Sequence, residues 1–283
     1  MILTDGQVEQ YRAHGYLFPL DLFDAAQVDA INADYRAARE DAGRLGLESE
    51  WPLLTRANAH YLMPFVHRTA CTPGLLDAVE SLLGPDLLLY SAEFFIKPAQ
   101  SDKIVSWHQD LTYWGLGETD EEITAWLALS EASTESGCMR FVPGSHRQPI
   151  LPHRDTFAED NLLSRGQEVA VDVDESAAVD VLLHPGQVSL HHGRMFHASG
   201  PNRSDQDRIG LVFRYVTPAV RQQVAARDYA TPVRGADTLG NWLHVAAPTR
   251  NFAAADLARY ARIRDEQRDA LAQGAEQELH AAY

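Results

Sequence analysis

Cysteine is scarce in this sequence, which has only Cys71 and Cys138 among its 283 residues. Two thiols are too few for a disulfide-stabilised scaffold or a thiolate metal cluster, so we expect buried thiols and a reducing compartment. The sequence also lacks an apolar window long enough to cross a membrane, and its first residues lack the basic and apolar regions of a secretory signal. These absences predict a cytoplasmic protein without a membrane partner.

Basic residues are also in deficit. Lys and Arg number 24 against 40 Asp and Glu, so the formal net charge is -16 at pH 7. Nucleic-acid binding that depends on cations meeting phosphates is therefore not expected. The composition, 45% hydrophobic and 23% charged, is that of an ordinary globular protein with a sizeable core. Because no internal repeat or linker-like segment interrupts the chain, we predict one domain over residues 1–283.

Helix-start signals dominate the first third of the chain. Two pairs of residues have the three-residue spacing of a capping box, and apolar residues follow each pair at helical intervals: Thr4 with Gln7, and Asp24 with Gln27. We place Tyr16 on the first helical face and extend the second helix towards Arg39. Thr72-Pro73 begins a further helix that Gly84-Pro85 ends. The sequence therefore predicts a helical region over residues 4–84.

From residue 86 onward, short apolar runs bounded by Gly, Pro and Asp replace the helical pattern. These runs are predicted strands: 87–96, 123–129, 139–142, 179–183, 188–192 and 208–216. Their succession without long helices predicts a mainly β, antiparallel jelly roll or barrel over about residues 86–216. The acidic segment 151–180 is expected to be a surface insertion and a candidate lid. Beyond Val216 we expect irregular chain to about Arg250, then a helix over about residues 252–273.

The stretch Trp107-His108-Gln109-Asp110 places an imidazole and a carboxylate two residues apart. In a strand, positions i and i+2 point to the same side at about 6 to 7 Å, so His108 and Asp110 form a chelating pair. One more histidine would complete the two-His, one-carboxylate triad of non-haem iron, which leaves three coordination positions open. A second His-x-Asp begins at His153 inside the acidic segment, and we interpret His153 as an exposed loop histidine.

Three histidines near the end of the predicted core compete for the third ligand: His191, His192 and His197. The distal carboxylate of 2-oxoglutarate needs a buried planar cation that pairs bidentately, which favours arginine. Arg208 follows His197 by eleven residues and begins a predicted strand. Arg203 follows His192 at the same separation but lies in a Gly-Pro-Asn turn and should be exposed. We therefore choose His197 and Arg208, and expect the other two histidines to be packed or to support the ligands.

Four stretches then carry a family resemblance. They are Trp-His-Gln-Asp-Leu-Thr-Tyr-Trp from Trp107, Thr-Ala-Trp from Thr124, Ser-Gly-Cys-Met-Arg-Phe-Val-Pro-Gly-Ser-His from Ser136, and His-Ala-Ser-Gly-Pro-Asn from His197. In order and spacing they resemble the phytanoyl-CoA dioxygenase family of Fe(II)- and 2-oxoglutarate-dependent oxygenases. The likeness covers about residues 3–215, and the remaining C-terminal part is less distinctive.

The resemblance implies a double-stranded β-helix flanked by helices, with Fe(II) bound by His108, Asp110 and His197. It also implies 2-oxoglutarate and molecular oxygen as cosubstrates, with the former oxidised to succinate and carbon dioxide while the substrate is hydroxylated. Arg208 would bind the distal carboxylate of 2-oxoglutarate, and Ser199 and Trp126 would complete the cosubstrate pocket.

Residues beside the metal-binding stretch are candidates to contact the substrate: Gln109, Tyr113 and Trp114. An acyl-CoA carries several phosphate charges and would need a cluster of cations, whereas the cations near the expected mouth are scattered. They are Lys97, Lys103, Arg140, Arg221 and Arg234. We therefore expect a small-molecule substrate, a small polar metabolite such as an amino acid or aminophosphonate. Hydroxylation of an acyl-CoA is the alternative.

Other functions share parts of this pattern. Related halogenases have a small residue in place of the carboxylate ligand, so Asp110 argues against halogenation. A non-catalytic metal-binding β-barrel would keep the ligands but would not need Arg208. A zinc hydrolase needs a different ligand set and a general base. The sequence does not define the oligomeric state.

Overall fold

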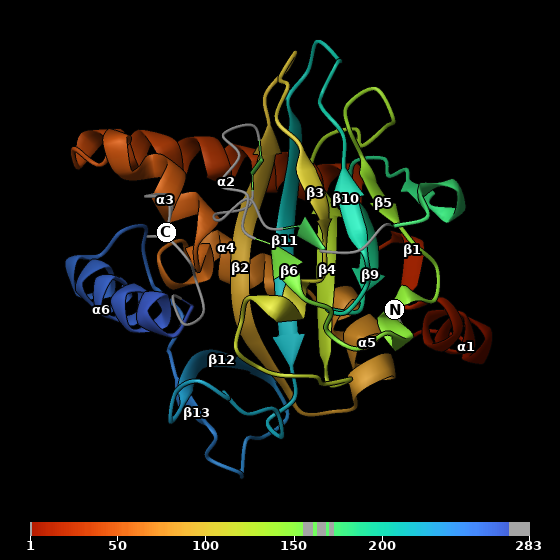
Figure 1. Ribbon diagram of the computed structural model, residues 1–283. Coiled ribbons are helices and arrows are strands. Elements are labelled where there is room, and N and C mark those ends of the chain that lie inside the picture. The colour runs from red at the N-terminus through yellow and green to blue at the C-terminus, as the bar shows by residue number, and fades with distance from the viewer. Residues whose placement is uncertain (1, 155–160, 163–167, 170–172, 272–283) are drawn as a thin grey trace.

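The computed structural model describes residues 2–154, 161–162, 168–169 and 173–271. Its core is a pair of facing sheets (Figure 1). The larger sheet has the strand order β1 (Tyr16–Asp21), β9 (Gln187–His191), β4 (Glu122–Ala128), β11 (Arg208–Val216), β2 (Leu87–Lys97), β12 (Asp228–Arg234) and β13 (Trp242–His244). The smaller sheet has the order β3 (Val105–His108), β10 (His197–Ser199), β5 (Met139–Phe141) and β8 (Val179–Val181). A short pair consists of β6 (His153–Arg154) and β7 (Glu168–Val169).

This arrangement confirms the predicted jelly roll with flanking helices. All strand pairs in the two main sheets are antiparallel except β12 with β13. Over the described residues the two sheets do not join into one closed barrel. The prediction of strand 208–216 coincides with β11, and the other predicted strands begin or end within two residues of the observed ones.

The helices lie at the outer face and sides of the larger sheet. They are α1 (Asp5–His14), α2 (Ala25–Arg44), α3 (Trp51–Arg56), α4 (Pro64–Ala70), α5 (Pro73–Leu83) and α6 (Ala254–Leu271). In Figure 1, α2, α4 and α5 lie behind this sheet, on the side away from β3 and β10. Both predicted capping boxes are present at the starts of α1 and α2. These side-chain hydrogen bonds satisfy backbone N–H groups at the start of each helix, which have no acceptor within the helix.

Two parts of the predicted arrangement were wrong. Tyr16 belongs to β1 rather than to the first helix, because Gly15 ends α1 in the left-handed conformation at a φ of 81°. The segment from Val216 to Arg250 is not irregular throughout, since it contains β12 and β13. The partner of β12 is β2, where Thr231 lies opposite Leu89, and such a remote pairing leaves no local pattern in the sequence.

The alternation of side chains along β11 separates core from cavity. Leu211, Phe213 and Tyr215 are fully buried against the helices in the main hydrophobic core. Arg208 and Arg214, at the alternate positions of the strand, point to its other side, towards the smaller sheet. A row of polar side chains between two sheets is what a functional cavity requires.

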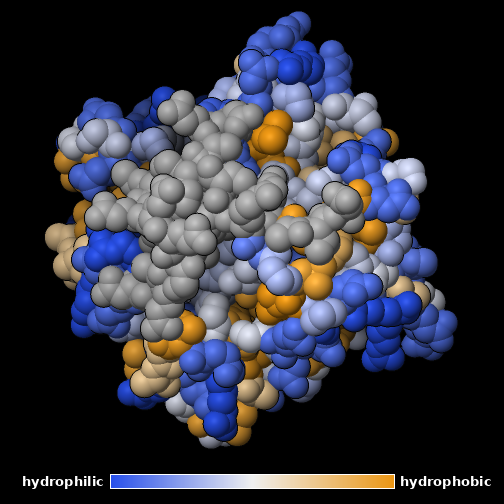
Figure 2. Space-filling view, in the orientation of Figure 1, coloured by the Kyte–Doolittle hydropathy of each residue, from blue (hydrophilic) through white to orange (hydrophobic). Residues whose placement is uncertain are grey.

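The outer surface carries few large exposed apolar side chains in the described residues: Ile2, Leu45, Val179, Leu182 and Leu239. On the face shown in Figure 2, hydrophilic residues predominate around smaller hydrophobic areas. Among the described helices we find none with the length and apolar character needed to cross a membrane. The proposed lid over 151–180 falls in part on 155–160, 163–167 and 170–172, which lie outside the described residues.

Candidate active site

A cavity of about 160 Å³ lies between the two sheets. Both sheets contribute to its lining, and so do α3 and α6. All six residues expected to bind metal or cosubstrate line it: His108, Asp110, His197, Arg208, Ser199 and Trp126. The structure thus brings together side chains that lie up to 100 positions apart in the sequence.

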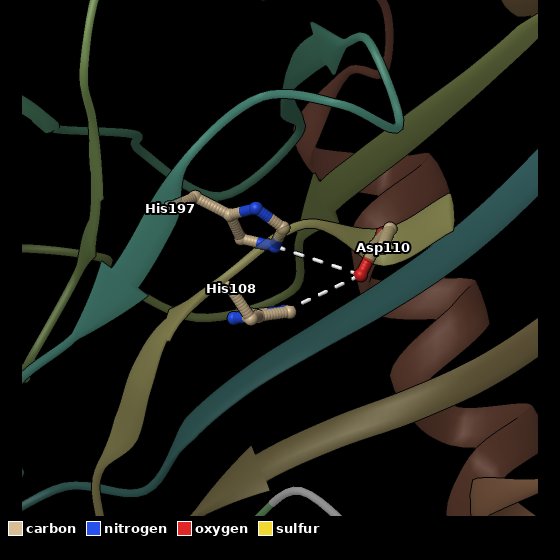
Figure 3. A group of neighbouring side chains, drawn as sticks. All are labelled: His108, Asp110 and His197. Carbon is tan, nitrogen blue, oxygen red and sulfur yellow. Dashed lines mark ion pairs between the residues drawn. The ribbon is translucent and has the colours of Figure 1, made fainter. Parts of the chain in front are cut away.

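The three expected metal ligands converge on one point (Figure 3). His108 ends β3 and lies opposite His197 of β10 in the strand register. Their Nε2 atoms lie 3.3 and 3.7 Å from Asp110 Oδ1, and one ligand atom from each residue fits within 4.8 Å of the others. Asp110 itself begins a single 3₁₀ turn, Asp110–Thr112, so the strand geometry assumed for it holds only as far as His108.

Hydrogen bonds fix which nitrogen of each histidine faces this point. The Nδ1 atom of His108 lies 2.9 Å from the carbonyl oxygen of Ser106, and that of His197 lies 3.0 Å from the carbonyl oxygen of Met195. A carbonyl oxygen can only accept, so each Nδ1 carries the proton and each Nε2 presents a lone pair. Burial, and then the neighbouring His108, lower the pKa of His197 well below its ordinary value, which keeps the imidazole neutral.

Asp110 is oriented by partners on its other oxygen. Thr124 Oγ1 donates to Asp110 Oδ2 at 3.2 Å, and Arg214 Nε lies 3.7 Å from the same atom. Burial alone favours the neutral acid, but the Arg214 guanidinium holds the pKa of Asp110 well below its ordinary value. An ionised carboxylate with Oδ1 turned towards the Nε2 atoms of two imidazoles is a donor set that fits Fe(II).

A second group of polar residues forms the other expected subsite. Arg208 is 1% exposed, its Nη1 donates to the carbonyl oxygen of Gly137, and its guanidinium lies 5.5 Å from the Trp126 ring. Burial lowers the pKa of Arg208 to about 10, so it remains a cation. Over the described part of the chain no carboxylate forms an ion pair with Arg208. A buried cation that is paired with no carboxylate among the described residues is suited to receive an anionic ligand.

Two residues that sequence reasoning did not place at this subsite shape it. Lys97 is fully buried and lies opposite Arg208 in the strand register, and its Nζ donates to Ser199 Oγ at 2.7 Å. It was expected near the mouth, yet it holds Ser199 from behind. Gly210 has no side chain where a Cβ would lie 2.1 Å from the Trp126 ring, so glycine allows the indole to lie across β11.

The two rejected histidines differ in position. His191 lines the cavity with its ring centroid 5.0 Å from that of His197, and neither of its ring nitrogens has a hydrogen-bond partner in the described parts. Burial lowers the pKa of His191 to about 4, so it is neutral. His192 instead pairs with Asp120 at 3.1 Å outside the cavity. Neither belongs to the three-residue cluster.

Of the three residues expected to face substrate, Tyr113 and Trp114 line the cavity and Gln109 does not. Gln109 is fully buried, and its amide binds the backbone of Pro149, Leu151 and Arg194. These three backbone contacts point its side chain away from the cavity.

His153 was wrongly interpreted as an exposed loop histidine. Its Nε2 accepts the backbone N–H of Gln109 at 3.2 Å, and its ring packs 5.7 Å from that of Tyr113. It therefore supports the metal-binding stretch from outside.

The cations expected at the mouth do not line the cavity. Arg140 pairs with Glu175 and Asp180, and Arg234 pairs with Asp77 and Glu80. Besides Arg208 and Arg214 of β11, three arginines from helices line it: Arg56, Arg264 and Arg268. Sequence reasoning missed them because α3 and α6, which carry them, meet only in the folded chain.

Comparison with known proteins agrees with this geometry. Residues 11–210 match the family model described as phytanoyl-CoA dioxygenase (PhyH). A probable alpha-ketoglutarate-dependent hypophosphite dioxygenase of Stutzerimonas stutzeri is 28% identical over 83% of each chain. The peroxisomal phytanoyl-CoA dioxygenase of Homo sapiens is 24% identical over 74% of this chain and 67% of its own. The solved structure of the non-heme monooxygenase ThoJ is 36% identical, covers 94% of this chain and 98% of its own, and superposes with a TM-score of 0.83.

Proposed function

Because the chain belongs to the phytanoyl-CoA dioxygenase family, we propose that His108, Asp110 and His197 bind the Fe(II) of a 2-oxoglutarate-dependent dioxygenase. The protein is an Fe(II)- and 2-oxoglutarate-dependent oxygenase, as its relatives are. The observation that carries the residue assignment is the convergence of two Nε2 lone pairs and one ionised carboxylate in a buried cluster. This is the two-His, one-carboxylate set that suits non-haem iron.

We assign 2-oxoglutarate to the subsite formed by Arg208, Ser199 and Trp126. Arg208 would hold the distal carboxylate as its buried counter-charge. Ser199 accepts a hydrogen bond from Lys97, so its own O–H is free to donate to the same carboxylate. Trp126 closes one wall and keeps water from the ion pair, which strengthens it.

The bound iron supplies oxygen activation, with 2-oxoglutarate and molecular oxygen as co-reactants, and the protein supplies orientation and charge balance. Asp110 offsets one positive charge of the metal. Thr124 and Arg214 keep its Oδ1 turned inward, and the carbonyl oxygens of Ser106 and Met195 hold the two imidazoles in the ligating tautomer. Tyr113 and Trp114 form the wall against which a substrate C–H bond would lie.

We propose that the substrate is a small polar metabolite. The cavity of about 160 Å³ is lined by arginine, carboxylate and amide groups as well as aromatic rings. The net charge of -16 opposes a ligand with several phosphate charges, such as an acyl-CoA. The relative from Stutzerimonas stutzeri bears the name of a small inorganic anion as its substrate.

Substrate-dependent release of succinate tests this proposal. Purified protein with Fe(II) and 2-oxoglutarate is offered amino acids, aminophosphonates, free carboxylic acids and acyl-CoAs under air. We expect stimulation by members of the small polar set. Turnover of acyl-CoA with none for the small polar set would overturn the proposed substrate class, and an absence of any iron-dependent succinate release would overturn the proposed function itself.

We also propose a cytoplasmic location and a single domain. Both cysteines are free thiols, which agrees with a reducing compartment. One hydrophobic core contains residues from Leu3 to Ile263, so the N-terminal helices, the larger sheet and α6 share it. Limited proteolysis should yield no stable fragment that lacks either end of this core.

A further inference from the structure

The lining of the cavity also includes a buried aspartate outside the metal cluster. Asp228 begins β12, is 5% exposed and lines the cavity. Its carboxylate accepts from Gln267 Nε2 at 2.9 Å, Gln222 Nε2 at 2.8 Å, Tyr90 Oη at 3.2 Å and the backbone N–H of Tyr229 at 2.7 Å. All four of these donors are neutral, so they hold the carboxylate in place without cancelling its charge.

Strand register shows where this aspartate lies along the cavity. On β11, Arg208 and Arg214 are six residues apart, which is about 20 Å along a strand. Arg214 approaches the carboxylate of the metal ligand Asp110. Its strand β11 pairs with one edge of β2, and β12 pairs with the other edge of β2, where Thr231 lies opposite Leu89. Counted back three residues from the pair Thr231 and Leu89, Asp228 lies at about the level of Ala92, and hence of Arg214, well away from Arg208. This part of the cavity lies beside the metal ligands and apart from the proposed cosubstrate subsite.

A chain of two amides leads from Asp228 to an unused acceptor. Because an ionised carboxylate only accepts, Gln267 must turn its Nε2 towards Asp228 and its Oε1 away. That Oε1 receives Asn58 Nδ2 at 2.8 Å, which leaves Asn58 Oδ1 at the end of the chain. In the described structure Asn58 Oδ1 has no hydrogen-bond partner, although the residue is only 8% exposed and lines the cavity.

An acceptor that is buried without a partner destabilises the protein, and a bound donor removes that cost. Asn58 also has a left-handed backbone, with a φ of 48°, which few residues other than glycine and asparagine tolerate. The structure thus holds this amide in an unfavourable state at the wall of a ligand cavity. Strain of this kind is common where a ligand completes the site.

The same cavity carries cations from two helices. Arg56 ends α3, while Arg264 and Arg268 lie four residues apart on one face of α6, with Gln267 between them. The two helices are neighbours in Figure 1, and Tyr260 of α6 donates to the carbonyl oxygen of Leu53 in α3 at 3.2 Å. Positive charge from α3 and α6 therefore borders the negative charge of Asp228.

We propose that this part of the cavity is a substrate site for a zwitterion, in which Asn58 and Asp228 receive a protonated amine and Arg56 and Arg264 receive an acidic group. This inference rests on the proposed function, and it names the substrate class as an amino acid or aminophosphonate. Asn58 Oδ1 accepts a hydrogen bond from the amine, and Asp228 supplies the opposite charge. The guanidinium groups pair with a carboxylate or a phosphonate equally well.

A matched panel tests the two halves separately. It contains α-amino acids and aminoalkylphosphonates of three to six carbons, each with its deaminated and its esterified counterpart. Each compound is titrated into anaerobic protein with Fe(II) and 2-oxoglutarate, with the visible charge-transfer band as the binding signal, and succinate release is then measured in air. The zwitterions should bind best, and each counterpart should bind at least about tenfold more weakly, because it leaves a buried polar group unpaired.

Three variants assign the contacts. Asn58→Gly keeps the left-handed backbone and should abolish the preference for the amine over its deaminated counterpart, while the preference for acid over ester remains. Arg264→Gln should do the reverse. Arg262→Gln is the control, since Arg262 is exposed on the same helix and does not line the cavity.

The outcomes separate this inference from the function on which it rests. If the charge-transfer band forms but no zwitterion perturbs it, or if Asn58→Gly leaves the amine preference intact, the zwitterion site is wrong and the dioxygenase assignment stands. If the band does not form in the unmodified protein, the proposed metal and cosubstrate sites fail instead.

Discussion

Replacing Arg208 with alanine removes the buried cation at the cosubstrate end of the cavity. Arg208 is 1% exposed, and the amine of the neighbouring Lys97 is engaged with Ser199 and Gly200. A distal carboxylate bound there would thus lose its main counter-charge and stay buried. Removing one partner of a buried, hydrogen-bonded charge pair costs about 2 to 5 kcal/mol, and about 1.4 kcal/mol is a tenfold change. We therefore expect the dissociation constant of 2-oxoglutarate to rise by about 30-fold to a few thousand-fold.

The assay is an anaerobic titration of the Fe(II)-loaded variant with 2-oxoglutarate, followed by the charge-transfer band. Binding of the metal alone should survive, because Arg208 is not part of the three-residue metal cluster. Arg208→Lys should recover only part of the affinity, since an ammonium cannot pair bidentately with a carboxylate.

Arg203→Ala is the matched control. Arg203 stands at the same separation from His192 as Arg208 from His197, yet its side chain is 58% exposed and pairs with Asp102 at the surface. Its loss should leave the titration unchanged. An unaltered affinity for 2-oxoglutarate in Arg208→Ala would refute the reasoning, and weakening by Arg203→Ala alone would favour the other pairing of histidine and arginine.

Three further predictions concern the surroundings of the site. Thr124→Val removes the hydroxyl that holds Asp110 Oδ2, so Fe(II) affinity measured by metal titration should fall by about 10- to 100-fold, and an unchanged affinity would show that Asp110 needs no such support. Burial lowers the pKa of Lys97 from its ordinary 10.5 to about 6, so the unfolded chain binds this proton more tightly than the folded protein. The resulting destabilisation is fully present below pH 6 and absent above pH 10.5. The free energy of unfolding should therefore gain a contribution from Lys97 as the pH rises between these two values. Lys97→Met should remove that rise from denaturation curves recorded at successive pH values, whereas parallel curves for the two proteins would contradict the assignment. Product formed in abundant chloride should be hydroxylated, because Asp110 fills the coordination position that a halide would take, and detection of a chlorinated product by mass spectrometry would contradict this.

Features that depend on neighbouring residues were predictable from the sequence. The capping boxes at Thr4 and Asp24 mark the starts of α1 and α2, because each is a set of bonds within four residues. Strand β11 was predicted with its observed bounds because its apolar run is long and is preceded by a turn. His108 and Asp110 were identified from the same kind of signal, a two-residue spacing, whereas His197 was chosen from its separation from Arg208 and from the family resemblance.

Features that depend on distant contacts were not predictable in this way. Strand β10 has only three residues and was missed, although it carries His197, because its partners β3 and β5 are remote in sequence. The amide of Asn58 meets Gln267 across 209 positions, so neither residue drew attention. Gln109 was expected to face substrate from its position beside the ligands, but the direction of its side chain is set by the backbone of residues 149–151 and 194.

The most direct test of the account is whether His108, Asp110 and His197 hold the iron. Fe(II) and 2-oxoglutarate are added under anaerobic conditions to the unmodified protein, to His197→Ala and to His192→Ala, and the visible spectrum is recorded. The account predicts a charge-transfer band in the unmodified protein and in His192→Ala, whose histidine lies outside the cavity and pairs with Asp120, and no band in His197→Ala. A band that persists in His197→Ala and disappears in His192→Ala would contradict it.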